Sequence, residues 1–306
     1  MRRVLMTGAT GYIGGRLLRR LISEGIEVAV LARDRTRLPA DLLPRLEVVE
    51  GGLDRIEALA GRFSGSYDVF YHLAWQGVAP EGRNDFDLQM QNIPACAACV
   101  RAAAALKIPR FVFPGSTMEY LYNGRPINAL AVPSCANAYG AAKIAAHYLA
   151  EEQARQLGVG FLYAVATSVY GVGREDGNVL FYVMEKLMKR EKPSVTKLEQ
   201  PWDYIHIDDL TGALLAIGER GRPGAFYAIG NGENHPLAEY LKLVRDLIDP
   251  ALPLGIGEIP YPGGRRPSSC IDPAALREDT GFVPAVSFEA GMREVVRHYR
   301  QKWGCA

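Results

Sequence analysis

The fold of this chain is decided by the stretch TGATGYIG, residues 7–14, near its amino-terminal end. The aliphatic residues 4–6 before it predict a strand, and residues 14–24 after it predict a helix. A strand, a glycine-rich turn and a helix in this order are typical of a phosphate-binding turn.

The glycines of this stretch have a chemical reason for their positions. The start of a helix presents unpaired N–H groups and a partial positive charge, which suit a pyrophosphate. We expect Gly8 to allow a sharp turn, Gly11 to let the phosphates approach, and Gly14 to let the helix pack closely on the strand. The residues predicted to contact a dinucleotide cofactor through its pyrophosphate are Gly8, Gly11, Tyr12, Ile13 and Gly14.

Strand and helix patterns alternate through the first half of the chain. Strands are predicted over residues 28–31, 46–50, 68–72, 110–113 and 160–166, and long helices over 84–106 and 138–157. Such alternation is typical of a parallel sheet with helices on both faces. The sequence therefore predicts an α/β fold with a doubly wound, Rossmann-type sheet that binds ligands at the carboxyl ends of its strands.

The pattern changes after about residue 170, where glycine and proline become more frequent. Helices are still predicted over residues 179–190, 237–248 and 288–300. We expect residues 1–170 to form a dinucleotide-binding domain, with residues 203–230 returning to it. Residues 171–306 are expected to form a smaller, irregular lobe that binds the substrate.

Charge and composition argue against several partners and sites. The formal net charge is +1 and no block of like charge stands out, so a nucleic-acid partner is not expected. No run approaches the ~18 apolar residues of a membrane span, and the first apolar stretch is too short for a signal peptide. We expect a soluble, cytoplasmic protein. Cys96 and Cys99 form a CxxC in an alanine-rich helix, where they are expected to be core residues because a zinc site needs more ligands.

The end of the second predicted strand bears on the choice of nicotinamide cofactor. Proteins that bind NAD usually place an acidic residue there, to accept hydrogen bonds from the ribose. Here Ala32 holds that position and Arg33 follows it, while Arg16 in the first helix could approach the same point. Two arginines suit a 2′-phosphate, so NADP is favoured over NAD. Asp34 leaves NAD open, because a small backbone shift would bring it to the ribose.

A candidate catalytic pair lies on the helix predicted over residues 138–157. Tyr139 and Lys143 form the pattern YxxxK and lie one helical turn apart on the same face. An ammonium beside a phenol lowers its pKa from the free value of ~10, so that it can transfer a proton near neutral pH. Ser116, at the end of the fifth strand, would face the same cleft and donate to the reacting oxygen.

Several further motifs complete the pattern. They are HLA at residues 72–74, Asn92 in the next helix, VYG at residues 169–171 and DYIHIDD at residues 203–209. Together with TGATGYIG, Ser116 and YxxxK, they resemble the extended short-chain dehydrogenases/reductases, the NAD-dependent epimerase/dehydratase family, which modify sugar nucleotides. The resemblance covers essentially the whole chain.

The resemblance implies roles for the matching positions. The catalytic residues it implies are Ser116, Tyr139 and Lys143. The cofactor-side residues it implies are Leu73, Ala74 and Asn92, of which Asn92 would help to place Lys143 through structure or water. Family members commonly form dimers through two helices of each subunit, which correspond here to residues 84–106 and 138–157, so a homodimer is expected.

The resemblance also bears on the reaction. Dehydratases of the family carry Asp and Glu directly after the catalytic hydroxyl residue, whereas Thr117 and Met118 stand here, which argues against a dehydratase. The run GSTMEY at residues 115–120 is similar to the GTCxEY run of deoxysugar 4-ketoreductases, and Trp75 replaces the small residue usual in epimerases. The expected reaction is NADPH-dependent reduction of a 4-keto deoxy sugar nucleotide, with Tyr139 as the proton donor.

Two other functions stay open at this point. One is a nucleotide-sugar 4-epimerase that retains NAD, and the other is a cofactor-sensing binding protein, against which the intact YxxxK argues. The residues expected to contact the substrate are Trp75, Thr117, Ser168, Arg265 and Arg266. The last two would meet the nucleotide diphosphate or form a solvated basic pair. The chain departs from the family at Val165 and Ser168, where Arg and Asn are common, and at Trp202, where Arg is common.

Overall fold

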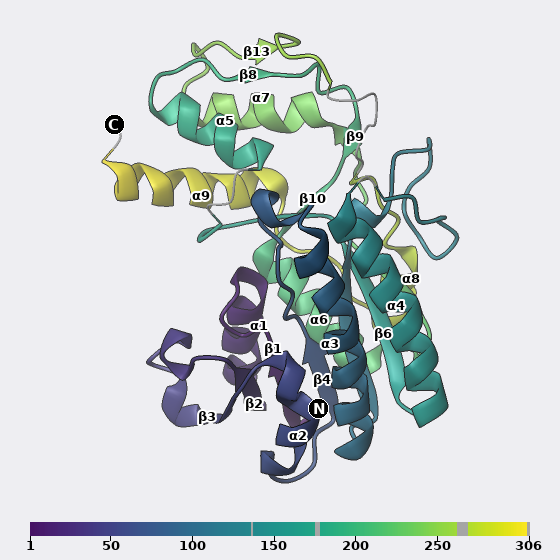
Figure 1. Cartoon of the computed structure of the whole chain (residues 1–306). Helices are drawn as coiled ribbons and strands as arrows, with labels where there is room; N and C mark the ends of the chain where they lie inside the picture. The colour runs from purple at the N-terminus through teal and green to yellow at the C-terminus, as the bar shows by residue number, and fades with distance from the viewer. Residues whose placement is uncertain (136, 175–177, 262–268, 305–306) are drawn as a thin grey trace.

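The centre of the molecule is a seven-stranded sheet with the strand order β11-β6-β5-β4-β1-β2-β3 (Figure 1). The computed structural model describes residues 1–135, 137–174, 178–261 and 269–304. Every pairing in this sheet is parallel. The strands are β1 (Arg3–Thr7), β2 (Glu27–Ala32), β3 (Leu46–Glu50), β4 (Val69–His72), β5 (Arg110–Ser116), β6 (Gly160–Ala166) and β11 (Phe226–Ile229). The predicted doubly wound α/β fold is confirmed.

Helices cover both faces of the sheet. Successive side chains of a strand point to opposite sides, so apolar residues on both faces need a covering layer. Val4 and Met6 of β1 enter one core, and Leu5 enters the other. The first core is closed by helices α1 (Tyr12–Ser23) and α6 (Ile207–Arg220). The second is closed by α2 (Ile56–Leu59), α3 (Phe86–Ala105) and α4 (Ala138–Leu157).

The strand order places a crevice beside β1. This strand pairs with β2 on one side and with β4 on the other, so the connections that leave β1 and β4 run to opposite halves of the sheet. In doubly wound sheets, ligands bind in the crevice at the carboxyl ends of such strands.

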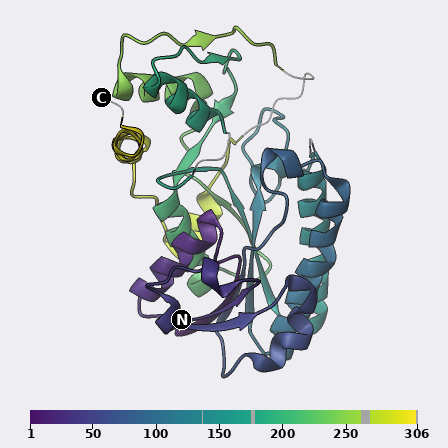
Figure 2. The same ribbon diagram turned by 60° about the vertical axis from the view of Figure 1, so that its left-hand side comes forward.

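A second group of helices forms a lobe beyond one end of the sheet, as the two views in Figures 1 and 2 show. Its helices are α5 (Val179–Met188), α7 (Leu237–Ile248) and α9 (Phe288–Trp303), which share a third apolar core. Its short strand pairs are β7 (Ser168–Tyr170) with β10 (Tyr204–His206), β8 (Ser194–Val195) with β13 (Gly255–Ile256), and β9 (Pro201–Trp202) with β12 (His235–Pro236).

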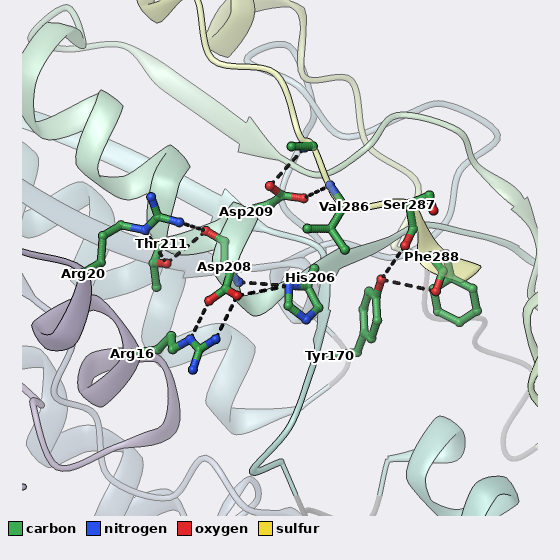
Figure 3. A network of polar contacts seen from close by, with 11 residues as sticks. Arg16, Arg20, Tyr170, His206, Asp208, Asp209, Thr211, Val286, Ser287 and Phe288 are labelled. Atoms are coloured by element: carbon green, nitrogen blue, oxygen red, sulfur yellow. Dashed lines mark hydrogen bonds and ion pairs between the residues drawn. The ribbon is translucent and has the colours of Figure 1, made fainter. Parts of the chain in front are cut away.

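The segment from β10 to β11 joins the lobe to the sheet. Figure 3 shows how α6 is fixed: the guanidinium of Arg20 donates to the backbone oxygen of Asp208, and the carboxylate of Asp209 accepts from the backbone N–H groups of Ala285 and Val286. After α6, strand β11 pairs with β6 at the edge of the sheet, and α8 (Ala274–Thr280) packs against α6 and β11. None of the helices in the described ranges is long and apolar enough to cross a membrane.

Candidate active site

A cleft of about 1720 Å³ lies at the carboxyl ends of β1, β2, β4 and β5 and extends under the lobe. The predicted site residues that line it are Gly8, Gly11, Tyr12, Ile13, Gly14, Arg33, Leu73, Ala74, Trp75, Ser116, Thr117, Tyr139, Lys143 and Ser168. Two predicted residues, Arg16 and Asn92, are not part of the lining. Arg265 and Arg266 lie outside the described residues.

The glycine turn at the start of the cleft is built by close backbone contacts. Gly8 has a φ of +78°, and a Cβ on it would lie 2.6 Å from the backbone nitrogen of Ala74, two residues after β4. A Cβ on Gly14 would lie 2.0 Å from the carbonyl oxygen of Gly8. These two glycines are therefore required by the packing of the protein itself.

Gly11 differs from the other two glycines, because the protein leaves room around it. A Cβ there would meet only the carbonyl oxygen of Gly8, at the ordinary distance of 3.4 Å. Gly11 is the N-cap of α1 and caps it without a side-chain hydrogen bond. The space beside Gly11 and the N–H groups of the first turn of α1 thus form a cradle that fits the pyrophosphate of a nicotinamide dinucleotide.

The end of β2 places a cation at the wall of the cleft. Ala32 and Arg33 line the cleft at the end of β2. The carboxylate of Asp34 accepts hydrogen bonds from the backbone nitrogen and the hydroxyl of Thr36, at 2.9 and 2.6 Å. These bonds lower the pKa of Asp34 and hold its side chain as the cap of the short helix η1 (Arg35–Arg37). The carboxylate of Asp34 is therefore already hydrogen-bonded within its own turn. Arg33 is the charged residue that lines the cleft at the end of β2.

The structure does not place Arg16 beside Arg33 in the cleft. The Arg16 guanidinium forms a two-pronged ion pair with the carboxylate of Asp208 in α6, with Nη2 2.8 Å from Oδ2 (Figure 3). This pair raises the pKa of Arg16 and lowers that of Asp208. Of the two arginines expected to bind a 2′-phosphate, Arg33 lines the cleft and Arg16 does not. Arg16 is paired with Asp208, which lies on a helix far along the chain.

The end of β4 is fixed by a buried contact. The Thr7 hydroxyl and the Nδ1 atom of His72 are 2.8 Å apart, which ties the ends of β1 and β4 together. Burial, with a smaller effect of the Lys143 charge, lowers the pKa of His72 to about 3. His72 is therefore neutral and structural, and it places Leu73 and Ala74 at the wall of the cleft.

Asn92 supports the same loop from behind. Its side-chain oxygen accepts from the backbone nitrogen of Gln76 at 2.8 Å, and its amide nitrogen donates to the carbonyl oxygens of Gln76 and Leu88. The side chain is buried in α3 and holds the loop after β4. It acts on the site through this loop, so the structure favours the structural role among those expected for Asn92.

Ser116 and Tyr139 meet in the cleft. Ser116 ends β5, and Tyr139 lies in the first turn of α4. The backbone N–H of Tyr139 donates to the carbonyl oxygen of Arg83 at 2.9 Å, which fixes the start of the helix. Burial raises the pKa of the Tyr139 hydroxyl to about 12, while its hydrogen bond with Ser116 and the nearby Arg83 guanidinium act in the opposite direction. The phenol is therefore protonated at neutral pH.

Lys143 lies one turn further along α4, in apolar and aromatic surroundings. Its Nζ donates to the carbonyl oxygen of Pro114 at 2.9 Å and lies 4.0 Å from the centroid of the Trp75 ring. Burial lowers the pKa of Lys143 to about 8, against a raising effect of Glu119. The prediction that Lys143 lowers the pKa of Tyr139 is wrong for this geometry, because burial of the phenol outweighs the attraction of nearby cations.

The predicted substrate residues gather on the lobe side of Ser116. The Trp75 ring stands edge-on to Tyr139, with 6.1 Å between centroids, and its Nε1 donates to Gln89. The hydroxyls of Thr117 and Ser168 both contact the hydroxyl of Ser269, at 3.3 and 3.0 Å. Hydroxyl groups from three distant segments thus meet at one point of the cleft wall, where a sugar could be held.

Two residues of this region were missed by sequence reasoning. Ser269 lines the cleft, but it lies 101 residues from Ser168 and 152 residues from Thr117 and carries no local pattern. Glu119 is fully buried beneath the site, and the run GSTMEY was its only signal in the sequence. Neither position could be assigned a contact without the fold.

The cysteine pair of α3 is part of the core, and its surroundings in the described structure do not suggest a metal site. Cys96 and Cys99 are both fully buried in the core under α3, which confirms that they are core residues. Within the described ranges, no three His, Cys, Asp or Glu side chains form a group that could hold a metal ion.

Comparison with known families agrees with this site. The model of the NAD dependent epimerase/dehydratase family matches residues 4–230, well over half of the chain. The chain therefore belongs to this family of NAD(P)-dependent epimerases, dehydratases and reductases, the extended short-chain dehydrogenases/reductases, which are oxidoreductases. The resemblance inferred from the motifs is confirmed.

Individual relatives are distant but similar over nearly their full length. UDP-glucose 4-epimerase of Streptomyces lividans is 28% identical over 315 residues, which cover 92% of each chain. dTDP-6-deoxy-L-talose 4-dehydrogenase (NAD(P)(+)) of Kitasatospora kifunensis is 26% identical and covers 96% of this chain and 94% of its own. The structure of dTDP-glucose 4,6-dehydratase from Streptomyces venezuelae, solved with NAD, has a TM-score of 0.85 at 21% identity, covers 99% and 98% of the two chains, and shows the same fold.

Proposed function

We propose that this protein reduces a 4-keto deoxy sugar nucleotide, with NADPH as the hydride donor. The observation that carries the proposal is the hydrogen bond between the Tyr139 phenol and Ser116, in the cleft that also holds the glycine cradle. Reduction of a ketone needs a proton donor in its first step, whereas an epimerase must first remove a proton from a hydroxyl. A phenol with a pKa of about 12 favours the first role.

The residues of the cleft have distinct parts in this reaction. Bound NADPH would supply the hydride to the C4 carbonyl carbon. The Tyr139 hydroxyl gives its proton to the carbonyl oxygen, which becomes the product hydroxyl, and the Ser116 hydroxyl holds that oxygen as negative charge develops. The Lys143 ammonium stabilises the phenolate that Tyr139 becomes and can hold a ribose hydroxyl of the cofactor.

The neighbours of Ser116 support reduction over dehydration. Thr117 and Met118 line the cleft directly after it, and neither can act as the acid and base that remove water from a sugar. The name of the Kitasatospora relative, a 4-dehydrogenase of a dTDP-6-deoxy sugar that uses NAD or NADP, supports both the substrate class and the position of the ketone.

The decisive experiment mixes the purified protein with NADPH and a panel of 4-keto sugar nucleotides. Loss of NADPH absorbance together with a product two hydrogens heavier is the expected result. The similarity to a UDP-glucose 4-epimerase defines the competing outcome. Absence of reduction, with interconversion of UDP- or dTDP-sugar epimers by protein that retains NAD, would replace the proposal.

Replacing Arg33 by alanine is expected to remove the preference for NADPH. Arg33 is the cation that lines the cleft at the end of β2, and its planar guanidinium suits the 2′-phosphate that NADH lacks. The loss of one charge-assisted hydrogen bond predicts a fall in kcat/KM for NADPH of about 10- to 100-fold, with little change for NADH. Steady-state kinetics with both cofactors measure this. Arg16→Ala is the matched control, since Arg16 is paired with Asp208, and it should leave the cofactor preference unchanged.

The pH dependence of the reaction should be set by Lys143. Below about pH 8 both Lys143 and Tyr139 are protonated, and this is the active form for reduction. As pH rises through the pKa of Lys143 the ammonium is lost, and kcat/KM falls. A profile of kcat/KM from pH 6 to 10 would show a plateau followed by this decline. A profile that stays flat up to pH 10 would show that Lys143 does not set the pH dependence.

We also propose that two copies of the chain pair through α3 and α4. Large apolar side chains are exposed on these helices: Phe86, Met90, Tyr148 and Leu149. An apolar surface of this kind is a mark of an interface. Light scattering should give about twice the chain mass of 33.5 kDa, and Leu149→Glu should reduce it to that of a monomer. A monomeric mass for the unaltered protein at micromolar concentration would contradict the pairing.

A further inference from the structure

We propose that Glu119 is a positioning residue of the active site, which supplies the counter-charge that keeps Lys143 an ammonium and fixes the backbone of Ser116. The inference rests on the proposed function only for its kinetic consequence. Glu119 does not line the cleft. It acts from beneath the site, through Lys143 and Ser116.

Glu119 is held by hydrogen bonds to both of its carboxylate oxygens. The backbone N–H of Ser116 donates to Oε1 at 2.6 Å, and the Tyr163 hydroxyl donates to Oε2. The Ser116 hydroxyl in turn accepts from the backbone N–H of Met118, so that Ser116 and Glu119 cap the short helix η6 (Thr117–Glu119) reciprocally. The carboxylate is 0% exposed. Burial raises the pKa of Glu119, and the hydrogen bond from Tyr163, the Lys143 charge and the backbone bond from Ser116 act in the opposite direction. Two donors on two oxygens match an ionised carboxylate.

The surrounding chain is shaped to hold this carboxylate. A Cβ on Gly115 would lie 2.9 Å from Oε1 of Glu119 and 2.4 Å from the hydroxyl of Tyr163. Tyr163 is itself held from the other side by the His147 ring, which stacks on it with 3.5 Å between centroids. Gly115 therefore leaves the space in which the acid reaches the strand end, and Tyr163 is fixed as its donor.

The charges around Lys143 identify Glu119 as its counter-ion. Three titratable groups of the described structure interact electrostatically with Lys143, namely His72, Cys96 and Glu119, and a fourth, Tyr139, lies one helical turn before it on α4. Burial leaves the first two uncharged at neutral pH, with pKa values of about 3 for His72 and about 12 for the Cys96 thiol. Tyr139 is a neutral phenol. Among these four groups, Glu119 is the acid whose negative form is stabilised by hydrogen bonds to both oxygens, so it is the counter-charge available to the ammonium.

A negative charge near Lys143 helps to keep its side chain protonated. A buried ammonium without a negative partner loses its proton, because desolvation disfavours the charged form. Burial already lowers the pKa of Lys143 to about 8, and Glu119 opposes that effect. The two charges do not form a close ion pair, so Nζ stays free to donate to the Pro114 carbonyl and to reach a cofactor hydroxyl.

The test measures the protonation of Lys143 directly, on the protein without cofactor. The chain has eight lysines, so carbon-13 at lysine Cε gives few signals, and Lys143→Arg identifies the one from Lys143. In Glu119→Gln, which keeps the shape and loses the charge, the titration midpoint of Lys143 should fall by about one pH unit. Glu152→Gln is the matched control, since it removes an exposed carboxylate from α4, and it should leave the midpoint unchanged.

The pH dependence of kcat/KM should show the same change in the Lys143 titration midpoint. The alkaline decline of kcat/KM should move to lower pH in Glu119→Gln by the amount that the Lys143 midpoint moves. If this variant does not fold, Glu119→Leu combined with Tyr163→Phe removes the acid and its hydroxyl partner together, which leaves fewer unpaired polar groups. The same lower midpoint is expected.

An unchanged Lys143 midpoint in a folded variant that lacks the Glu119 charge would overturn the inference. The result is independent of the proposed function, because the titration uses neither substrate nor cofactor. A shifted midpoint without reduction of any 4-keto sugar nucleotide would remove the reductase proposal alone. Reduction with an unmoved midpoint would remove the role of Glu119 alone.

Discussion

Replacing Tyr139 by phenylalanine lowers kcat for reduction by about 10²–10⁴-fold, the usual contribution of a positioned proton donor. The variant keeps the ring that stands edge-on to Trp75, so the cleft retains its shape. It loses only the hydroxyl that is bonded to Ser116 and that gives the proton to the ketone oxygen. Stopped-flow measurement of NADPH oxidation gives the rate constant, and titration of NADPH fluorescence gives its affinity, which should change little.

The control for this experiment is Tyr122→Phe, which removes the hydroxyl of an exposed tyrosine outside the cleft and should leave kcat as it is. Tyr139→Phe with normal kcat would show that another group donates the proton. A variant that binds NADPH poorly would instead mean that the hydroxyl serves the cofactor more than the reaction.

The sheet and most helices followed from the sequence because their signals are local. The helix predicted over residues 138–157 and the one over 237–248 have the same bounds as α4 and α7. Each has a distinct start, such as the side chain of Asn137 that accepts from the backbone of Gly140. Among the elements that were not predicted are helix α6, strand β11 and helix α8, which pack against the sheet and against one another.

The site was predictable where the topology of the sheet brings strand ends together. Ser116 and the glycine turn follow strands of one parallel sheet, and carboxyl ends of such strands share an edge. Arg16 was misplaced because its partner Asp208 is 192 residues away. The protonation of Tyr139 was misjudged for a related reason, since the spacing to Lys143 is visible in the sequence and burial is not.

The glycine turn allows a prediction that separates folding from binding. Gly14→Ala should destabilise the protein by about 1–3 kcal/mol, the cost of forcing a methyl group into a packed contact, because its Cβ would lie 2.0 Å from the carbonyl oxygen of Gly8. It should also displace the start of α1 and weaken NADPH binding. Gly11→Ala should fold normally, since its Cβ meets that oxygen at 3.4 Å. Its methyl group would occupy the cradle, and the loss of a charge-assisted hydrogen bond predicts NADPH binding weaker by about 10- to 100-fold.

Denaturant unfolding and NADPH titration of the two variants distinguish the roles of the glycines. Gly61→Ala is the control for the substitution itself, because a Cβ there meets nothing within 4 Å, and it should change neither stability nor binding. A Gly11→Ala variant that binds NADPH normally would show that the pyrophosphate does not approach the start of α1 at this point. Loss of stability in Gly11→Ala as large as in Gly14→Ala would show that Gly11 serves the fold rather than the ligand, and the separation into a packing glycine and a binding glycine would be wrong.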